Sequence, residues 1–104
     1  MVTKRVDDAT RQVKDLLVDR YATVHPRADI DVYRYNPVSI RIRIVDPDFD
    51  GKSVPQRERA VWRFLRTLPE DVRADISVCL LITPDEQASS PMNLEFEKPS
   101  RSRM

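Results

Sequence analysis

Few side chains in this 104-residue sequence have types and spacings that could support catalysis or metal binding. The chain has one histidine, His25, and one cysteine, Cys79, and they lie far apart in the sequence. A metal site needs several converging donors, and no close His or Cys pairs occur. No nucleophile stands beside a suitable base, and no glycine-rich loop of the P-loop type is present. We therefore expect no enzymatic activity, no metal site and no cofactor.

Both residues have a structural interpretation. His25 stands before a proline at the expected end of a helix, where an imidazolium would interact favourably with free carbonyl groups. A ligand or pH-sensing role is the alternative. Cys79 lies in an apolar stretch, opposite in phase to its apolar neighbours, which indicates a partly covered, inert thiol. A reactive thiol would need a cationic neighbour such as Arg41 or Arg43.

Arginines and tyrosines are expected together on one face of a sheet. Arg41 and Arg43 alternate with isoleucines in one predicted strand, and Tyr33 and Tyr35 belong to the strand before it. Such a mixture can stack nucleic-acid bases. The competing interpretation is a solvated sheet face, in which Asp31 and the tyrosines are cross-strand partners of the arginines.

The stretch from 39 to 68 provides the scaffold for these side chains. Alternating isoleucines up to Ile44 predict a half-buried strand, and Asp46 can cap a single helical turn that Gly51 would end with a left-handed conformation. Ser53 and Gln56 have the spacing of a capping box, which predicts a long amphipathic helix from there. Arg57 lies at the edge of its apolar sector. We expect its guanidinium to reach the aspartates of the preceding turn, which are Asp46, Asp48 and Asp50.

The remaining pattern completes a small domain. A helix is predicted over 3–24 with Thr3 as its cap, and a short strand around Ile30 is joined to the next strand by an Asn36-Pro37 turn. These two strands should form an antiparallel hairpin, and the last strand, 76–82, should run parallel to its neighbour after a helical crossover. The order helix, strand, strand, short helix, helix, strand predicts an α+β two-layer sandwich: a three-stranded mixed sheet with helices on one face.

Length and composition set the limits. Residues 1–86 are expected to form a single domain, and 87–104 a disordered tail, with a short edge strand near 92–96 as the alternative. The net charge of +1 argues against strong binding of duplex DNA. No apolar run is long enough to span a membrane, and the single cysteine fits a reducing compartment, so we expect the protein in the cytoplasm.

A series of short motifs resembles the BolA family. The family pattern is a strand ending in I-V-S, then F-x-G, then an R-H-R helix start, a histidine early in the last strand, and T-P-E-E after it. The matching residues are Ile44, Val45, Phe49, Gly51, Lys52, Arg57, Arg59, Thr83, Pro84 and Glu86. The resemblance covers about half the chain and implies the type II KH-like fold, in agreement with the predicted order of elements.

Two departures limit what the resemblance implies about activity. BolA proteins assemble with monothiol glutaredoxins, and a histidine of the last strand helps to hold an iron-sulfur cluster. Here Glu58 replaces the histidine between the arginines, and the ligand position falls at about Asp75. A carboxylate is a poor substitute for imidazole on such a cluster, so we expect no cluster ligation of the family's kind.

Two hypotheses follow. The first is a non-enzymatic protein-interaction module that binds a monothiol glutaredoxin or another protein through the loop from Phe49 to Lys52, the long helix and the last strand, including Glu58 and Asp75. The second is a KH-like module for RNA or DNA. KH domains bring a G-x-x-G loop close to phosphates, and the corresponding loop here keeps Gly51 and Lys52 but lacks the second glycine.

Overall fold

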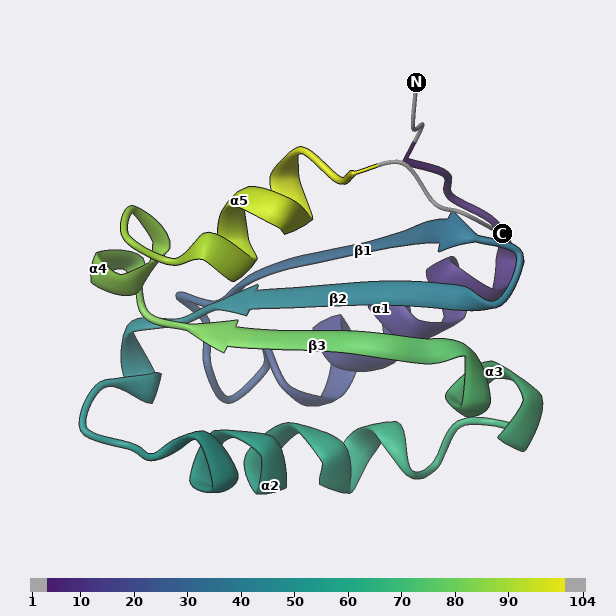
Figure 1. Ribbon diagram of the computed structural model, residues 1–104. Helices are drawn as coiled ribbons and strands as arrows, with labels where there is room; N and C mark the ends of the chain where they lie inside the picture. The colour runs from purple at the N-terminus through teal and green to yellow at the C-terminus, as the bar shows by residue number, and fades with distance from the viewer. Residues whose placement is uncertain (1–3, 101–104) are drawn as a thin grey trace.

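Strand β2, Ser39–Val45, lies at the centre of a three-stranded sheet in the computed structural model, which describes residues 4–100 (Figure 1). The other elements are α1 (Asp8–Arg20), β1 (Asp29–Asn36), the 3-10 turn η1 (Pro47–Phe49), α2 (Val54–Leu65), α3 (Glu70–Asp75), β3 (Ile76–Ile82), α4 (Pro84–Gln87) and α5 (Pro91–Glu97). The predicted order of helices and strands is confirmed as far as β3, except that the short helix α3 stands before β3, and two more short helices follow β3. Among the described residues, no helix is both long and apolar enough to cross a membrane.

The sheet has the predicted topology. Its strand order is β1-β2-β3, with β1 antiparallel to β2 and β2 parallel to β3. The alternating isoleucines of β2 are fully buried beneath α1 and α2, together with Val13, Leu17, Val61 and Leu65 of those helices. This apolar layer is the core of the domain, and the alternation of the strand residues puts the arginines of β2 on the opposite face.

Helix α1 begins later than the sequence pattern predicts. Asp7 is its N-cap and forms a capping box with Thr10, so the helix starts at residue 8. Thr3, the predicted cap, lies outside the described residues. The Asp7 carboxylate also accepts a hydrogen bond from Arg34 of β1 at 2.9 Å. A local cap with a tertiary partner therefore determines where the helix begins.

The predicted turn at 46–51 and the predicted start of α2 are confirmed, whereas the predicted polar connection after α2 is not. Asp46 caps η1, Gly51 has φ of +76°, and Ser53 and Gln56 form the predicted capping box of α2. The predicted polar connection from Pro69 contains a short helix instead, α3, which buries Val72. Val72 belongs to the apolar core, so this short helix packs against it.

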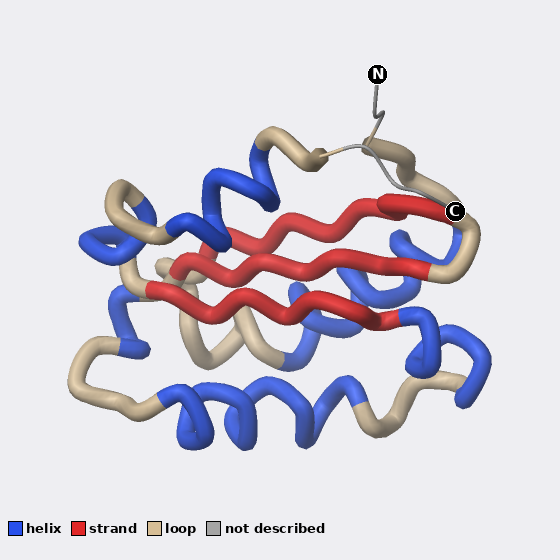
Figure 2. Tube along the Cα trace, in the orientation of Figure 1, coloured by secondary structure: helices blue, strands red, loops and turns tan. Residues whose placement is uncertain are grey.

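The described residues after 86 do not form a disordered tail. Residues 84–87 and 91–97 form α4 and α5, and α5 packs across the sheet face that α1 and α2 leave open (Figures 1 and 2). Phe96 is 2% exposed and contacts Tyr33, with 4.8 Å between the ring centroids. The alternative of an edge strand near 92–96 is also wrong, because these residues are helical. Residues 101–104 lie outside the described part of the chain.

Candidate functional site

The arginine and tyrosine face of the sheet is covered by α5. Arg43 donates hydrogen bonds to Asn93 and to Asp31, both at 2.7 Å, and is 7% exposed. Arg41 donates to Glu95 at 2.8 Å, and the hydroxyl of Tyr33 donates to the main-chain oxygen of Phe96 at 2.8 Å. The predicted pairing of Arg43 with Asp31 is present, but the partners on α5 were not foreseen.

Helix α5 occupies the sheet face on which nucleic-acid bases were expected to stack. The guanidinium of Arg41 lies 3.5 Å from the centroid of the Tyr35 ring, and that of Arg43 lies 4.9 Å from the Phe96 ring. The Nε groups of both arginines are buried without a hydrogen-bond acceptor among the described residues, so the aromatic faces replace part of their hydration. Arg41 in turn holds the pKa of Glu95 below its usual range. These groups stabilise the attachment of α5 and are not presented to a ligand.

The loop from Phe49 to Lys52 exposes fewer side chains to a binding partner than the sequence predicts. Phe49 is 1% exposed and belongs to the core, so it cannot contact a partner. Gly51 and Lys52 are exposed, and the main-chain oxygen of Lys52 accepts a hydrogen bond from Arg57 at 3.0 Å. Of this loop, the Lys52 side chain remains available for binding.

Arg57 is structural, as expected, but with other partners than the predicted aspartates. Its guanidinium binds both carboxylate oxygens of Glu86, at 2.6 and 3.1 Å, and donates to the main-chain oxygen of Leu81 at 3.0 Å. Glu86 also forms a capping box with Thr83 at the start of α4. These hydrogen bonds, with Arg57 the largest cause, lower the pKa of Glu86 to about 2. The Thr-Pro-Asp-Glu sequence is a capping-box signal that could have identified Glu86 in advance.

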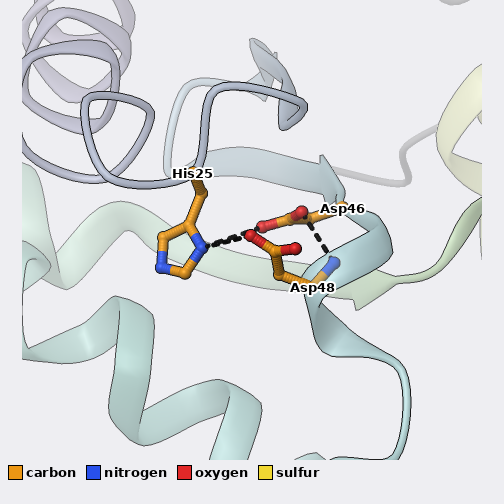
Figure 3. A group of neighbouring side chains, drawn as sticks. All are labelled: His25, Asp46 and Asp48. Carbon is orange, nitrogen blue, oxygen red and sulfur yellow. Dashed lines mark hydrogen bonds and ion pairs between the residues drawn. The ribbon is translucent and has the colours of Figure 1, made fainter.

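His25, Asp46 and Asp48 form the only group among the described residues with the spacing of a metal site (Figure 3). The Nδ1 of His25 lies 2.8 Å from Asp48 Oδ2 and 3.7 Å from Asp46 Oδ2. Each carboxylate already has protein donors: the hydroxyl of Tyr21 and the amide of Asp48 bind Asp46, and Arg27 binds Asp48. The side chain of His25 also stacks on the Tyr21 ring, 4.3 Å away. This hydrogen-bonded cluster joins the end of α1 to η1, and a cation there would have to displace existing bonds.

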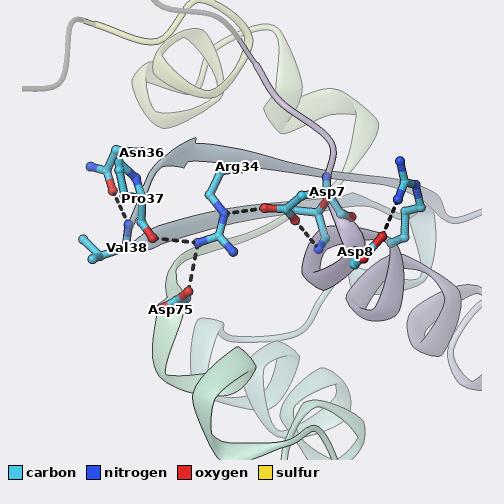
Figure 4. A network of polar contacts seen from close by, with 9 residues as sticks. Asp7, Asp8, Arg34, Asn36, Pro37, Val38 and Asp75 are labelled. Atoms are coloured by element: carbon cyan, nitrogen blue, oxygen red, sulfur yellow. Dashed lines mark hydrogen bonds and ion pairs between the residues drawn. The ribbon is translucent and has the colours of Figure 1, made fainter.

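Asp75 is engaged on another side of the molecule (Figure 4). Its carboxylate accepts a hydrogen bond from Arg34 at 2.9 Å, and Arg34 also binds Asp7 at 2.9 Å. Arg34 thus links the starts of α1 and β3 across the end of the sheet, and its pKa is raised by these two carboxylates against the effect of burial. The residue at the family's ligand position therefore has a structural partner here.

An open groove runs along the outer edge of β3. It has a volume of about 430 Å³, and its walls come from the start of α2, from β3 and from the segment after α4. Six residues that line it are Val54, Glu58, Cys79, Leu80, Ser89 and Ser90. Burial, with a contribution from the charge of Glu58, raises the pKa of Cys79 to about 12, so the thiol stays protonated at neutral pH.

A second hollow, of about 630 Å³, lies between α4 and α5. Among the described residues that line it, Glu97 is the one ionisable residue, and none belongs to a β-strand. The groove beside β3 is smaller, but it combines a strand edge, apolar side chains such as Val54 and Leu80, and the charged Glu58. It is the better candidate for binding, and it contains one of the residues that the sequence predicted, Glu58.

Comparisons with protein-family models, with curated proteins and with solved structures gave no match to this chain. The resemblance to BolA proteins is therefore carried by the sequence motifs alone.

Proposed function

We propose that this chain is a non-enzymatic protein-interaction module that binds a partner protein in the groove beside β3. The observation that carries the proposal is the groove itself, which borders a free strand edge and holds Glu58 without an ion pair among the described residues. The neighbouring acid, Glu86, is already bound by Arg57. Glu58 is thus the carboxylate of the groove that is available to a partner.

The groups that most often perform catalysis support the non-enzymatic part of the proposal. Cys79 has a raised pKa, so its thiolate is scarce at neutral pH and it is a weak nucleophile. The imidazole of His25 is stacked on Tyr21 and bound to Asp48. Both residues therefore have structural surroundings. A single protonated cysteine also suits a reducing compartment, and we place the module in the cytoplasm.

Nucleic-acid binding is the second candidate function. Lys52 at the start of α2 favours it, because its exposed ammonium group and the helix N-terminus both attract a phosphate. The covered arginine face counts against it, since Arg41 and Arg43 already pair with residues of α5. We rank this function below protein binding.

The test is a pair of NMR titrations of the ¹⁵N-labelled protein. The protein partner implied by the sequence resemblance is a monothiol glutaredoxin of the same organism, used with and without its cluster. Amide shifts that saturate and gather around Glu58, Cys79 and Ser89 would support the proposal. A single-stranded oligonucleotide is the second probe. Saturable shifts around Lys52 that weaken steeply with salt would instead favour nucleic-acid binding and would overturn the proposal.

A further inference from the structure

The groove exposes the backbone of an edge strand. Within residues 4–100, strand β3 pairs only with β2, and the direction of its peptide groups alternates along the chain. The main-chain oxygen of Ile82 accepts from the amide of Asp46, so it points toward β2, whereas the oxygen of Leu81 accepts from Arg57 and points away. By this alternation, the peptide groups of Cys79 also point away from β2, into the groove.

Most of this outward backbone has no partner inside the protein. Arg57 satisfies the oxygen of Leu81. No side chain, loop or helix in the described part of the chain bonds to the amides of Cys79 and Leu81 or to the oxygen of Cys79. Two donors and one acceptor therefore face the groove. They lie on alternate residues of β3, which is the spacing at which a neighbouring strand forms main-chain hydrogen bonds.

The sequence of strand β3 also lacks the residue types that usually protect an edge. Its sequence, ISVCLLI, contains no charged residue and no proline. The register shift near Ser77 is confined to the start of the strand, and the rest pairs regularly with β2. An edge of this composition is suited to pairing with another strand.

The walls of the groove define what kind of strand would fit. Helix α2 runs alongside β3 below the sheet in Figure 1 and supplies the exposed Val54 and Glu58. The residues after α4, Ser89 and Ser90, form the opposite wall. A carboxylate at the rim attracts a cationic side chain, and the apolar floor accepts β-branched ones. A second copy of β3 fits poorly, because that strand has no basic residue to place against Glu58.

We propose that an extended segment of the partner protein adds to β3 as a fourth strand, with a lysine or arginine of that segment against Glu58. This inference rests on the proposed function and specifies how the partner binds. Main-chain hydrogen bonds to Cys79 and Leu81 would supply affinity, and the charge pair would select basic segments. Arg57 would remain on the oxygen of Leu81, whose second lone pair is free to accept from the added strand.

The test uses synthetic peptides as the added strand. The probe is acetyl-VKVTVKV-amide, and its partner with glutamates in place of lysines tests the charge preference. Two further versions carry N-methyl groups on alternate residues, one on the odd and one on the even positions. In an added strand only one of these two sets of amides faces β3, so only one methylated peptide should lose binding, by roughly tenfold or more.

Binding is followed by NMR and by amide exchange. We expect the basic peptide at saturation to slow exchange at Cys79 and Leu81 at least roughly tenfold, while the amides of Val78 and Leu80, already within the sheet, change little. Glu58→Arg should reverse the preference toward the acidic peptide. The matched control is Asp15→Arg, which introduces the same charge change at an exposed position of α1.

Three results would overturn strand addition. They are equal binding of both methylated peptides, binding without protection of Cys79 and Leu81, and no binding at millimolar peptide. Equal binding of the methylated peptides in the groove would leave the proposed function in place, because a partner could then dock through side chains alone. The glutaredoxin titration is independent of these peptides, so the two proposals can fail separately.

Discussion

Replacing Arg57 with alanine should be among the most destabilising changes in α2. The residue is 7% exposed and donates four hydrogen bonds, two to main-chain oxygens and two to the carboxylate of Glu86. Counted at the typical net value of about 1 kcal/mol, the two bonds to main-chain oxygens together contribute about 2 kcal/mol. The Glu86 side chain is 45% exposed, so water can hydrate it after the change, and the ion pair is best counted at about 1 kcal/mol.

The expected loss for Arg57→Ala is about 3 kcal/mol in the free energy of unfolding. For a domain of this size that corresponds to a fall in Tm of roughly 12–24 °C. Thermal unfolding by circular dichroism measures the change, and urea unfolding provides a second estimate at constant temperature. Arg57→Lys keeps the charge but cannot form the two parallel bonds to Glu86, so its loss should be intermediate.

Arg59→Ala is the matched control, because Arg59 lies on the same helix and is exposed. We expect its Tm to stay within about 4 °C of the wild type. If Arg57→Ala unfolds at the same temperature as Arg59→Ala, the hydrogen bonds to Lys52, Leu81 and Glu86 do not stabilise the fold and the reasoning is wrong.

Three other predictions concern separate parts of the molecule. The pKa of Glu86 is lowered to about 2 from an ordinary 4.5, so its contribution to stability is complete above pH 4.5 and is lost as pH falls toward 2. The Tm difference between wild type and Glu86→Gln should therefore be constant near neutral pH and vanish in acid. A difference that grows in acid would contradict this. Phe96→Ala should cost about 3 kcal/mol in unfolding experiments, whereas Leu94→Ala, at a residue 61% exposed on the same helix, should cost less than about 0.5 kcal/mol; similar losses would mean that α5 is not anchored by Phe96. The raised pKa of Cys79, about 12, predicts that iodoacetamide labels the native thiol at pH 8 about a thousandfold more slowly than it labels the unfolded chain, and rapid labelling of the native protein would refute the assignment.

The fold up to β3 could be predicted because its signals are local. Alternation in β2, the capping boxes and the glycine at position 51 each act over a few residues, and tertiary packing agrees with all of them. The predicted start of α1 was wrong because Asp7 caps the helix while it also binds Arg34, a residue 27 positions further on. Sequence periodicity carries no information about such a distant partner.

The C-terminal segment shows the opposite case. Its composition is that of a disordered tail, with isolated apolar residues among polar ones. The helix forms because Phe96 has an aromatic partner on the sheet and because two arginines attract Asn93 and Glu95. The same contacts explain why the candidate site could be predicted only in part: Glu58 borders the groove, but Tyr33, Tyr35, Arg41 and Arg43 are used by the protein itself.

The position of α5 after the β1–β2 hairpin in the chain has a consequence for its synthesis. The hairpin of β1 and β2 can form as soon as residue 45 has emerged from the ribosome, whereas its cover ends at residue 97. During the interval, Arg41 and Arg43 lack their partners on α5 and lie uncovered beside Tyr33 and Tyr35. A nascent chain of this protein therefore passes through a state whose exposed surface is cationic and aromatic, although in the folded domain α5 covers much of that surface.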